Sequence, residues 1–235
     1  VLPDNHGIRI AAADVMYSRM KYEDSLALLR EDSGDTFALK DVWRHFRVAA
    51  ALQDLAVTDR FLKRLLSADT LSADEVRELS GICLKMGLAH THGRACVRRI
   101  QRQTLHDETS TEIAMELLLA LNDPGGARAA GEAYLSTADS RKVQLLMTRA
   151  DYGKGAYEDC VQRLSRIGGI TDQKYMLIWA ESLLQLGKVD ESISLWPGDP
   201  QDAFWHLHVL RCGIAMMQGS DRHRNPEIEA ACNQV

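Results

Sequence analysis

The amino-acid sequence predicts an all-α fold, a solenoid of about six to seven antiparallel helical hairpins. Two observations indicate it: a short segment recurs near a fixed period, and pairs of small residues recur at a fixed separation. The composition agrees with helices, because the 235 residues include only five prolines and no stretch alternates between apolar and polar residues as a strand does.

The recurring segment occurs three times, as Lys21–Leu26, Ala156–Val161 and Lys188–Ile193. The second residues of these segments lie 135 and 32 residues apart, and 135 is close to four times 34. A period near 34 predicts three more turns between helices, near residues 56, 90 and 123. The chain has a suitable break at each place: Asp54-Leu55-Ala56, Met86-Gly87-Leu88 and Asn122-Asp123-Pro124-Gly125-Gly126.

Small residues recur in pairs twelve positions apart, one on each helix of a hairpin. Two helices cross closely only where the side chains at the contact are small, so this spacing is typical of a tightly packed antiparallel hairpin. The pairs are Ala13 and Ser25, Thr148 and Cys160, and Ala180 and Ser192.

These residues make the sequence similar to the tetratricopeptide repeat (TPR) family, whose unit has 34 residues, small residues at two fixed places, a glycine and an aromatic residue. The matching residues are Ala180, Gly187 and Ser192 in one repeat, with Val189 replacing the aromatic residue, and Gly155, Tyr157 and Cys160 in the repeat before. The resemblance covers residues 6–34 and 141–196 and is weaker between 40 and 138. It implies a right-handed solenoid with a concave groove for a partner peptide or helix. The family's terminal proline is missing in register, which leaves open a related helical-hairpin family.

Six hairpins are expected along one domain, residues 1–235. Their ranges are about 6–32, 40–68, 72–104, 109–137, 140–168 and 172–196, and residues 201–235 are expected to form C-terminal capping helices. Residues that cap helices support several of these starts, namely Ser72, Thr109 followed by Glu112, and Thr171-Asp172.

Charge is spread unevenly along the chain, whose net charge is −5. Residues 60–106 hold nine Lys/Arg and four acids, so this segment carries +5 and the remainder −10. On one predicted helix Arg94, Arg98 and Arg102 are spaced to lie on one face. Together with Arg60 and Arg64 of the preceding second helix, and Arg128 of the following one, they predict a convex basic patch. The patch is either a docking surface for an acidic protein or a solvated face. Nucleic acid is not favoured, because Phe61 is the only aromatic residue nearby.

The resemblance also implies which residues face the concave groove. They are Lys142, Leu145, Arg149 and Tyr152 in the fifth hairpin, Lys174, Leu177, Glu181 and Leu184 in the sixth, and Ile10, Asp14 and Tyr17 in the first. Lys142, Arg149 and Lys174 are candidates to clamp an acidic side chain or a terminal carboxylate. The alternative is that they only solvate the groove.

Motifs for catalysis, metals and cofactors are missing, so the sequence predicts no enzyme, no metal site and no cofactor. It has no Walker loop, no GxSxG or HExxH motif and no pair of CxxC motifs. Gly153-Lys154-Gly155 is interpreted as a hairpin turn. Neither His90 and His92 nor His206 and His208 are natural chelates, because residues two apart on a helix point in different directions.

The five cysteines and the apolar runs favour a cytoplasmic protein. The cysteines lack CxxC spacing and are interpreted as small buried residues in a reducing compartment. No signal peptide is visible, and no run reaches the roughly 18 apolar residues that span a membrane.

Together these features predict a non-enzymatic scaffold or adaptor that binds a partner segment in its concave groove. The expected partner is another protein, an extended peptide or helix with acidic groups, and the oligomeric state is open. The alternative is a helical-repeat segment of a larger enzyme or of a secretion or transport assembly, where it would position the catalytic part or an anionic polymer. A stand-alone all-α enzyme is a third hypothesis.

Overall fold

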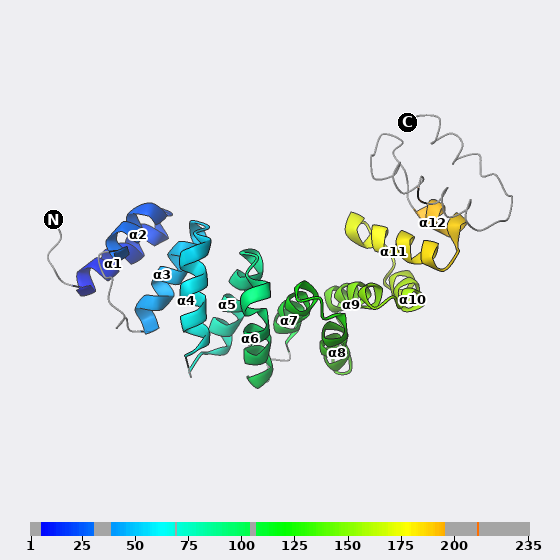
Figure 1. The fold of residues 1–235 in the computed structure, drawn as a ribbon, viewed down its shortest axis with the longest axis horizontal. Coiled ribbons are helices and arrows are strands. Elements are labelled where there is room, and N and C mark those ends of the chain that lie inside the picture. Colours follow the sequence, from blue (N-terminus) through cyan, green and yellow to red (C-terminus); the bar gives the residue numbers. More distant parts are fainter. Residues whose placement is uncertain (1–5, 31–38, 69, 104–106, 196–210, 212–235) are drawn as a thin grey trace, which may run out of the picture. The chain divides into compact units, whose positions relative to one another are not determined.

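The computed structural model describes residues 6–30, 39–68, 70–103, 107–195 and 211, and the elements in these ranges are all α-helices (Figure 1). The helices are α1 (His6–Ser18), α2 (Tyr22–Arg30), α3 (Leu39–Ala51), α4 (Leu55–Leu66), α5 (Ala73–Lys85), α6 (Ala89–Arg102), α7 (Glu108–Ala120), α8 (Pro124–Leu135), α9 (Arg141–Gly153), α10 (Tyr157–Ile167), α11 (Gln173–Gln185) and α12 (Val189–Leu195). The C-terminal helices expected in 201–235 lie outside the described residues. None of the described helices is long and apolar enough to cross a membrane.

The helices group into two compact units, residues 1–121 with α1–α7 and residues 122–235 with α8–α12. In the first unit α1/α2, α3/α4 and α5/α6 pack as hairpins, and the second helices α4 and α6 also pack against each other. In the second unit α9/α10 and α11/α12 pack as hairpins, and the first helices α9 and α11 are neighbours. Each unit is therefore a stack of helical hairpins, whereas the single domain over 1–235 stays a prediction.

The turns that follow α1, α3, α5, α7, α9 and α11 each hold one residue in the left-handed conformation. These residues are Met20, Gln53, Gly87, Asn122, Gly155 and Gly187, with φ between 56° and 74°. They lie 33, 34, 35, 33 and 32 residues apart, which confirms the period near 34. The three turns expected near 56, 90 and 123 occur at Gln53, Gly87 and Asn122.

The pairs of small residues are buried at the crossing of their helices, as predicted, and they are also hydrogen-bonded. The Ser25 hydroxyl donates to the Ala13 carbonyl at 2.8 Å, and the Ser192 hydroxyl donates to the Ala180 carbonyl at 2.7 Å. In the third pair the Cys160 thiol donates to the Thr148 carbonyl at 3.3 Å. Each small residue on a second helix therefore links that helix to the backbone of the first.

Helix starts follow the capping residues at two of the three predicted places. Ser72 forms a capping box with Glu75, and Asp172 caps α11. The prediction for Thr109 is wrong, because α7 begins at Glu108 and Asp107 is its N-cap. The Asp107 carboxylate accepts from the Ser110 amide at 3.0 Å, a bond that the Thr109 side chain does not make.

Candidate partner-binding surfaces

Two adjoining hollows lie along the first helices of residues 1–121. The larger has a volume of about 550 Å³, and its lining residues are Asp14, Tyr17, Leu39, Lys40, Trp43, Arg44, Arg47 and Glu75. The smaller, of about 340 Å³, shares Tyr17 and Arg47 with it and is also lined by Tyr22, Ala50, Ala51, Glu78, Ile82, Lys85 and Met86. Together they form one depression over α1, α3 and α5, which we call the N-terminal groove.

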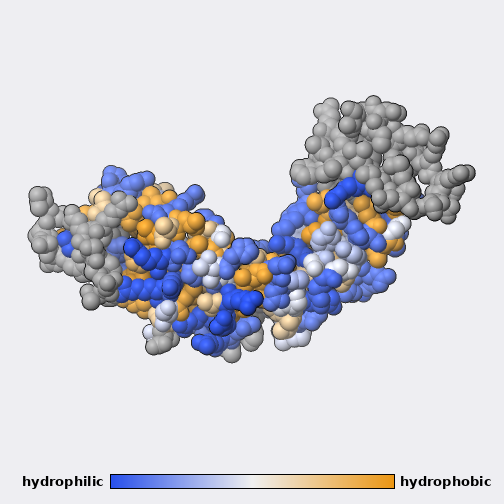
Figure 2. Space-filling model, in the orientation of Figure 1, coloured by the Kyte–Doolittle hydropathy of each residue, from blue (hydrophilic) through white to orange (hydrophobic). Residues whose placement is uncertain are grey.

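Large apolar side chains are exposed in this part of the chain, and one of them, Tyr17, lines the groove. The large hydrophobic residues most exposed among the described ones are Ile8, Val15, Tyr17, Met20 and Leu55. Figure 2 shows apolar surface, in orange, broken by hydrophilic groups over the α1–α4 part of the chain. A surface of this kind offers apolar contact and charge to the same ligand.

Ion pairs between successive hairpins hold the walls of the N-terminal groove. Arg44 donates to Asp14 on α1 at 2.8 Å and to Asp41 at 3.0 Å. Arg47 binds Glu78 on α5 with two hydrogen bonds of 2.6 and 2.7 Å. These contacts neutralise both arginines and link α3 to its neighbours on either side, so the groove is built before any ligand arrives.

Trp43 lies in the wall of the larger hollow and has an unsatisfied donor. Its side chain is only 6% exposed, and it packs edge-on against Phe46 and beneath the Arg47 guanidinium. The indole Nε1 is buried and has no hydrogen-bond partner among the residues that the structure describes. A buried donor without an acceptor costs about 1–3 kcal/mol, so an acceptor that reaches this N–H after a local rearrangement of the wall would remove that cost.

The groove residues expected in the fifth and sixth hairpins lie on α9 and α11, which are neighbours. All eight are partly or fully exposed: Lys142, Leu145, Arg149, Tyr152, Lys174, Leu177, Glu181 and Leu184. Lys142, Arg149 and Lys174 each already interact with another group of the protein. Burial and then the charge of the Glu181 carboxylate raise the pKa of Tyr152.

The predicted groove residues of α9 and the residues of α3 that line the N-terminal groove stand at the same four places of the repeat. Counted back from the left-handed turn residue, Lys142, Leu145, Arg149 and Tyr152 stand 13, 10, 6 and 3 positions before Gly155. On α3 the same offsets from Gln53 give Lys40, Trp43, Arg47 and Ala50, which line the N-terminal groove. In the first hairpin, Asp14 and Tyr17 line the groove as well, but Ile10 is buried in the core.

The basic residues predicted on the second helices lie on α4 and α6, which pack together. Arg60, Arg94, Arg98 and Arg102 are exposed, and Arg64 is half-buried with a polar partner. Arg128 does not belong with them. It lies on α8 in the other unit, where it forms ion pairs with Glu132, Asp151 and Asp159 at 2.7, 2.8 and 2.9 Å.

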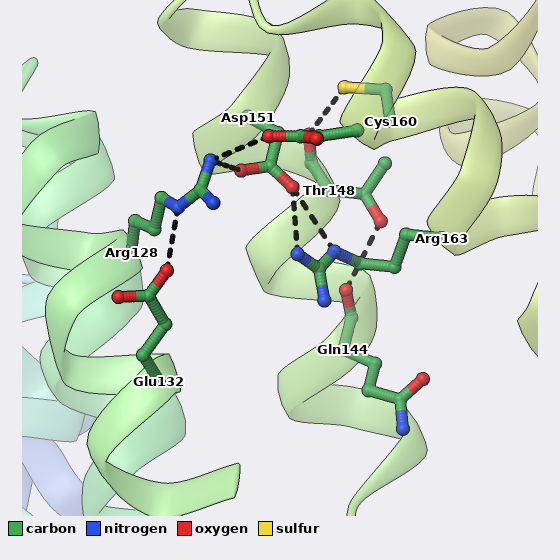
Figure 3. A network of polar contacts seen from close by, with 8 residues as sticks. Arg128, Glu132, Gln144, Thr148, Asp151, Cys160 and Arg163 are labelled. Carbon is green, nitrogen blue, oxygen red and sulfur yellow. Dashed lines mark hydrogen bonds and ion pairs between the residues drawn. The ribbon is translucent and has the colours of Figure 1, made fainter. Parts of the chain in front are cut away.

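Arg128 belongs to a polar network centred on the buried Asp151 (Figure 3). The Asp151 carboxylate is fully buried and accepts from Arg128 on α8 at 2.8 Å and from Arg163 on α10 at 3.0 and 3.1 Å. Burial raises the pKa of Asp151, and the two arginines oppose that rise. The network links α8 and α10 to α9, on which the residue after Asp151, Tyr152, belongs to the predicted groove face.

The side chains of the described cysteines, and of His45 and His92 among the histidines, are buried. Cys83, Cys96 and Cys160 are buried free thiols, and burial raises the pKa of Cys160 to about 12, which keeps it protonated at neutral pH. His92 is buried against Asp59 at 2.8 Å. Within the described ranges, no three potential metal ligands gather in one place.

Comparison with known proteins agrees on the fold. No protein-family model and no curated protein matches this sequence. The crystal structure of a tetratricopeptide repeat protein from Parabacteroides merdae superposes with a TM-score of 0.61 over 96% of this chain and 96% of that one, at 10% identity. At that identity the likeness concerns the fold, and the chain has the fold of a TPR-like helical solenoid of repeated hairpins.

Proposed function

We propose that this protein is a non-enzymatic scaffold that holds a segment of a partner protein in the N-terminal groove. The observation that supports this function most directly is the buried indole N–H of Trp43, a residue that lines an open hollow, since this donor has no acceptor among the described residues. A peptide backbone offers a carbonyl at every residue, so a peptide is the simplest ligand able to satisfy this donor.

The groove also indicates the side chains of its ligand. Lys40 and Lys85 line the two hollows and are exposed, with no ion-pair partner within the part of the chain that the structure describes. Arg44 and Arg47 are already neutralised by carboxylates. We therefore expect a segment with an apolar residue against Tyr17 and Trp43 and an acidic residue near one of the lysines.

The α3 face from Lys40 to Ala50 is long enough for a short peptide. Ten residues of helix rise about 15 Å, which is the length of about five residues in an extended chain. The equivalent face of α9 and α11 is proposed to bind a partner segment in the same way, with Lys142, Arg149 and Lys174 as its cations. A repeat segment within a larger enzyme or export assembly would use the same groove, and that alternative stays a prediction from the sequence.

Selection of peptides from a random library on the full-length chain tests this function. We expect the selected peptides to share an apolar and an acidic residue. Their affinity should fall about tenfold on Trp43→Phe, which keeps a ring but removes the donor, and by a similar factor on the double change Lys40→Glu and Lys85→Glu. The matched control is Lys154→Glu with Arg166→Glu, two exposed cations of the other unit that belong to neither groove face, and it should bind as the wild type does. If the groove variants bind the peptides as tightly as the wild type, the N-terminal groove is not their site.

A further inference from the structure

We infer that the α4–α6 basic face, made of Arg60, Lys63, Arg94, Arg98 and Arg102, is a second docking surface that binds an acidic segment of a protein. It lies on the second helices of the hairpins, whereas the N-terminal groove lies on the first helices. The two surfaces are therefore independent, and either can fail experimentally without the other.

The charge of these two helices is strongly one-sided. Together α4 and α6 carry seven Lys/Arg and a single acid, Asp59, in a chain whose net charge is −5. The Asp59 carboxylate contacts the buried His92 and not the exposed cations, because it lies 2.8 Å from His92 Nε2. Nothing on either helix remains to neutralise the exposed cations.

The arginines of this face differ from those of the first helices. Arg44, Arg47 and Arg77 each form an ion pair with a carboxylate of a neighbouring hairpin. The side chains of Arg94, Arg98 and Arg102 are exposed and form no hydrogen bond or ion pair with any residue that the structure describes. These three guanidinium groups can therefore bind a ligand without first breaking an internal contact.

Polar contacts at both ends fix α4 and α6 to each other, so the cations of the two helices keep one register. At one end His92 contacts Asp59. At the other, the Arg99 guanidinium donates to the carbonyls of Leu66 and Ala68 at 2.7 and 2.6 Å. A surface held in this way loses little conformational entropy when a partner binds.

The spacing and the residue type favour carboxylates as ligands. Arg94, Arg98 and Arg102 follow one another at a rise of about 6 Å, which matches acids four residues apart on a helix or two apart in an extended strand. The planar guanidinium pairs well with a carboxylate through two parallel bonds. Single-stranded nucleic acid would need exposed rings for stacking, but Phe61 is only 5% exposed.

Fluorescence anisotropy with the full-length chain tests this docking surface. The probe is a labelled synthetic helical peptide with glutamate at every fourth position, and an oligonucleotide of equal charge is measured beside it. The face variant carries Arg94→Glu, Arg98→Glu and Arg102→Glu. The matched control carries Arg19→Glu, Lys154→Glu and Arg166→Glu, three exposed cations elsewhere, so that both variants change the net charge equally.

We expect the acidic peptide to bind the wild type, to bind more weakly as salt rises, and to bind the face variant about tenfold or more weakly. The control should stay close to the wild type, and circular dichroism should give all three chains the same melting temperature. Equal losses of peptide affinity in the face and control variants would show that the peptide is attracted by the overall charge of the protein and not by this face. An oligonucleotide that binds the face more tightly than the peptide would show that the ligand of this face is a nucleic acid and not an acidic protein segment. Either result would overturn the inference.

Discussion

Replacing Asp151 by asparagine should destabilise the unit formed by residues 122–235 far more than any surface change. The carboxylate is 0% exposed, and it receives three hydrogen bonds from two arginines on different helices. The Asp151→Asn variant keeps the volume of the side chain but removes its charge. The amide has one oxygen in place of the two carboxylate oxygens, so it can accept from Arg128 or from Arg163 but not from both.

The magnitude follows from the burial of this pair. Breaking a buried ion pair by removing one partner costs about 3–5 kcal/mol. Arg128 keeps Glu132 and Asp159, and the Arg163 side chain is 22% exposed and can reach water, so the lower end of about 3 kcal/mol is expected. In a unit of this size that loss lowers the melting temperature by about 10 °C or more.

Asp159 provides the matched control, because it contacts the same Arg128 from the surface. Its side chain is 47% exposed and makes one ion pair of 2.9 Å, so Asp159→Asn should cost less than about 1 kcal/mol. The assay is thermal and urea unfolding of both variants followed by circular dichroism. Equal losses in the two variants, or no loss with Asp151→Asn, would refute the role given to the buried carboxylate.

Four further predictions test other parts of the structure. Ala180→Trp should overpack the crossing of α11 and α12 and cost a few kcal/mol, and an unchanged melting temperature would contradict the repeat register. Gln53→Gly should stabilise the chain by up to about 1 kcal/mol in urea unfolding, since φ is 57° there, whereas Gly155→Ala, at φ 74°, should destabilise it. Asp107→Ala should cost about 1 kcal/mol at neutral pH. Although burial opposes it, hydrogen bonds from Ser110 lower the folded-state pKa of Asp107 below 3.8, so the difference in unfolding free energy from wild type should vanish as pH falls through that pKa. Cys160 should resist thiol reagents in the native protein and react after unfolding, as peptide mass spectrometry would show, because burial raises its pKa to about 12.

The repeat and its register could be predicted because a few positions carry strong local signals. Gly155 and Gly187 mark turns that need a left-handed residue, and Ser25, Cys160 and Ser192 mark close helix crossings. Met20 and Gln53 adopt the same left-handed conformation without being glycine, so nothing in their residue type shows it. The match to the repeat between residues 40 and 138 is weak partly for this reason.

The sequence alone predicts little of the N-terminal groove, because Asp14 and Tyr17 are the only residues lining it that are expected to face a groove. With Gln53 recognised as a turn residue, the offsets that place Lys142 and Arg149 on a groove face would have pointed to Lys40 and Arg47. The hollow itself depends on side-chain packing around Trp43, which no periodic pattern encodes. The sequence places Arg128 with the basic patch, because it shows that this residue is basic and lies in a helix. It does not show that a buried carboxylate on another helix, Asp151, forms an ion pair with it.

The most direct test of the proposed function observes the indole proton of Trp43 itself. The chain has four tryptophans, so a nitrogen–proton correlation spectrum should show four indole signals, and Trp43→Phe identifies the one that belongs to Trp43. Titration with a library-selected peptide should move this signal downfield, as expected when a free N–H gains an acceptor. A peptide that binds tightly and leaves the Trp43 signal in place would contradict the proposal that the N-terminal groove holds the partner.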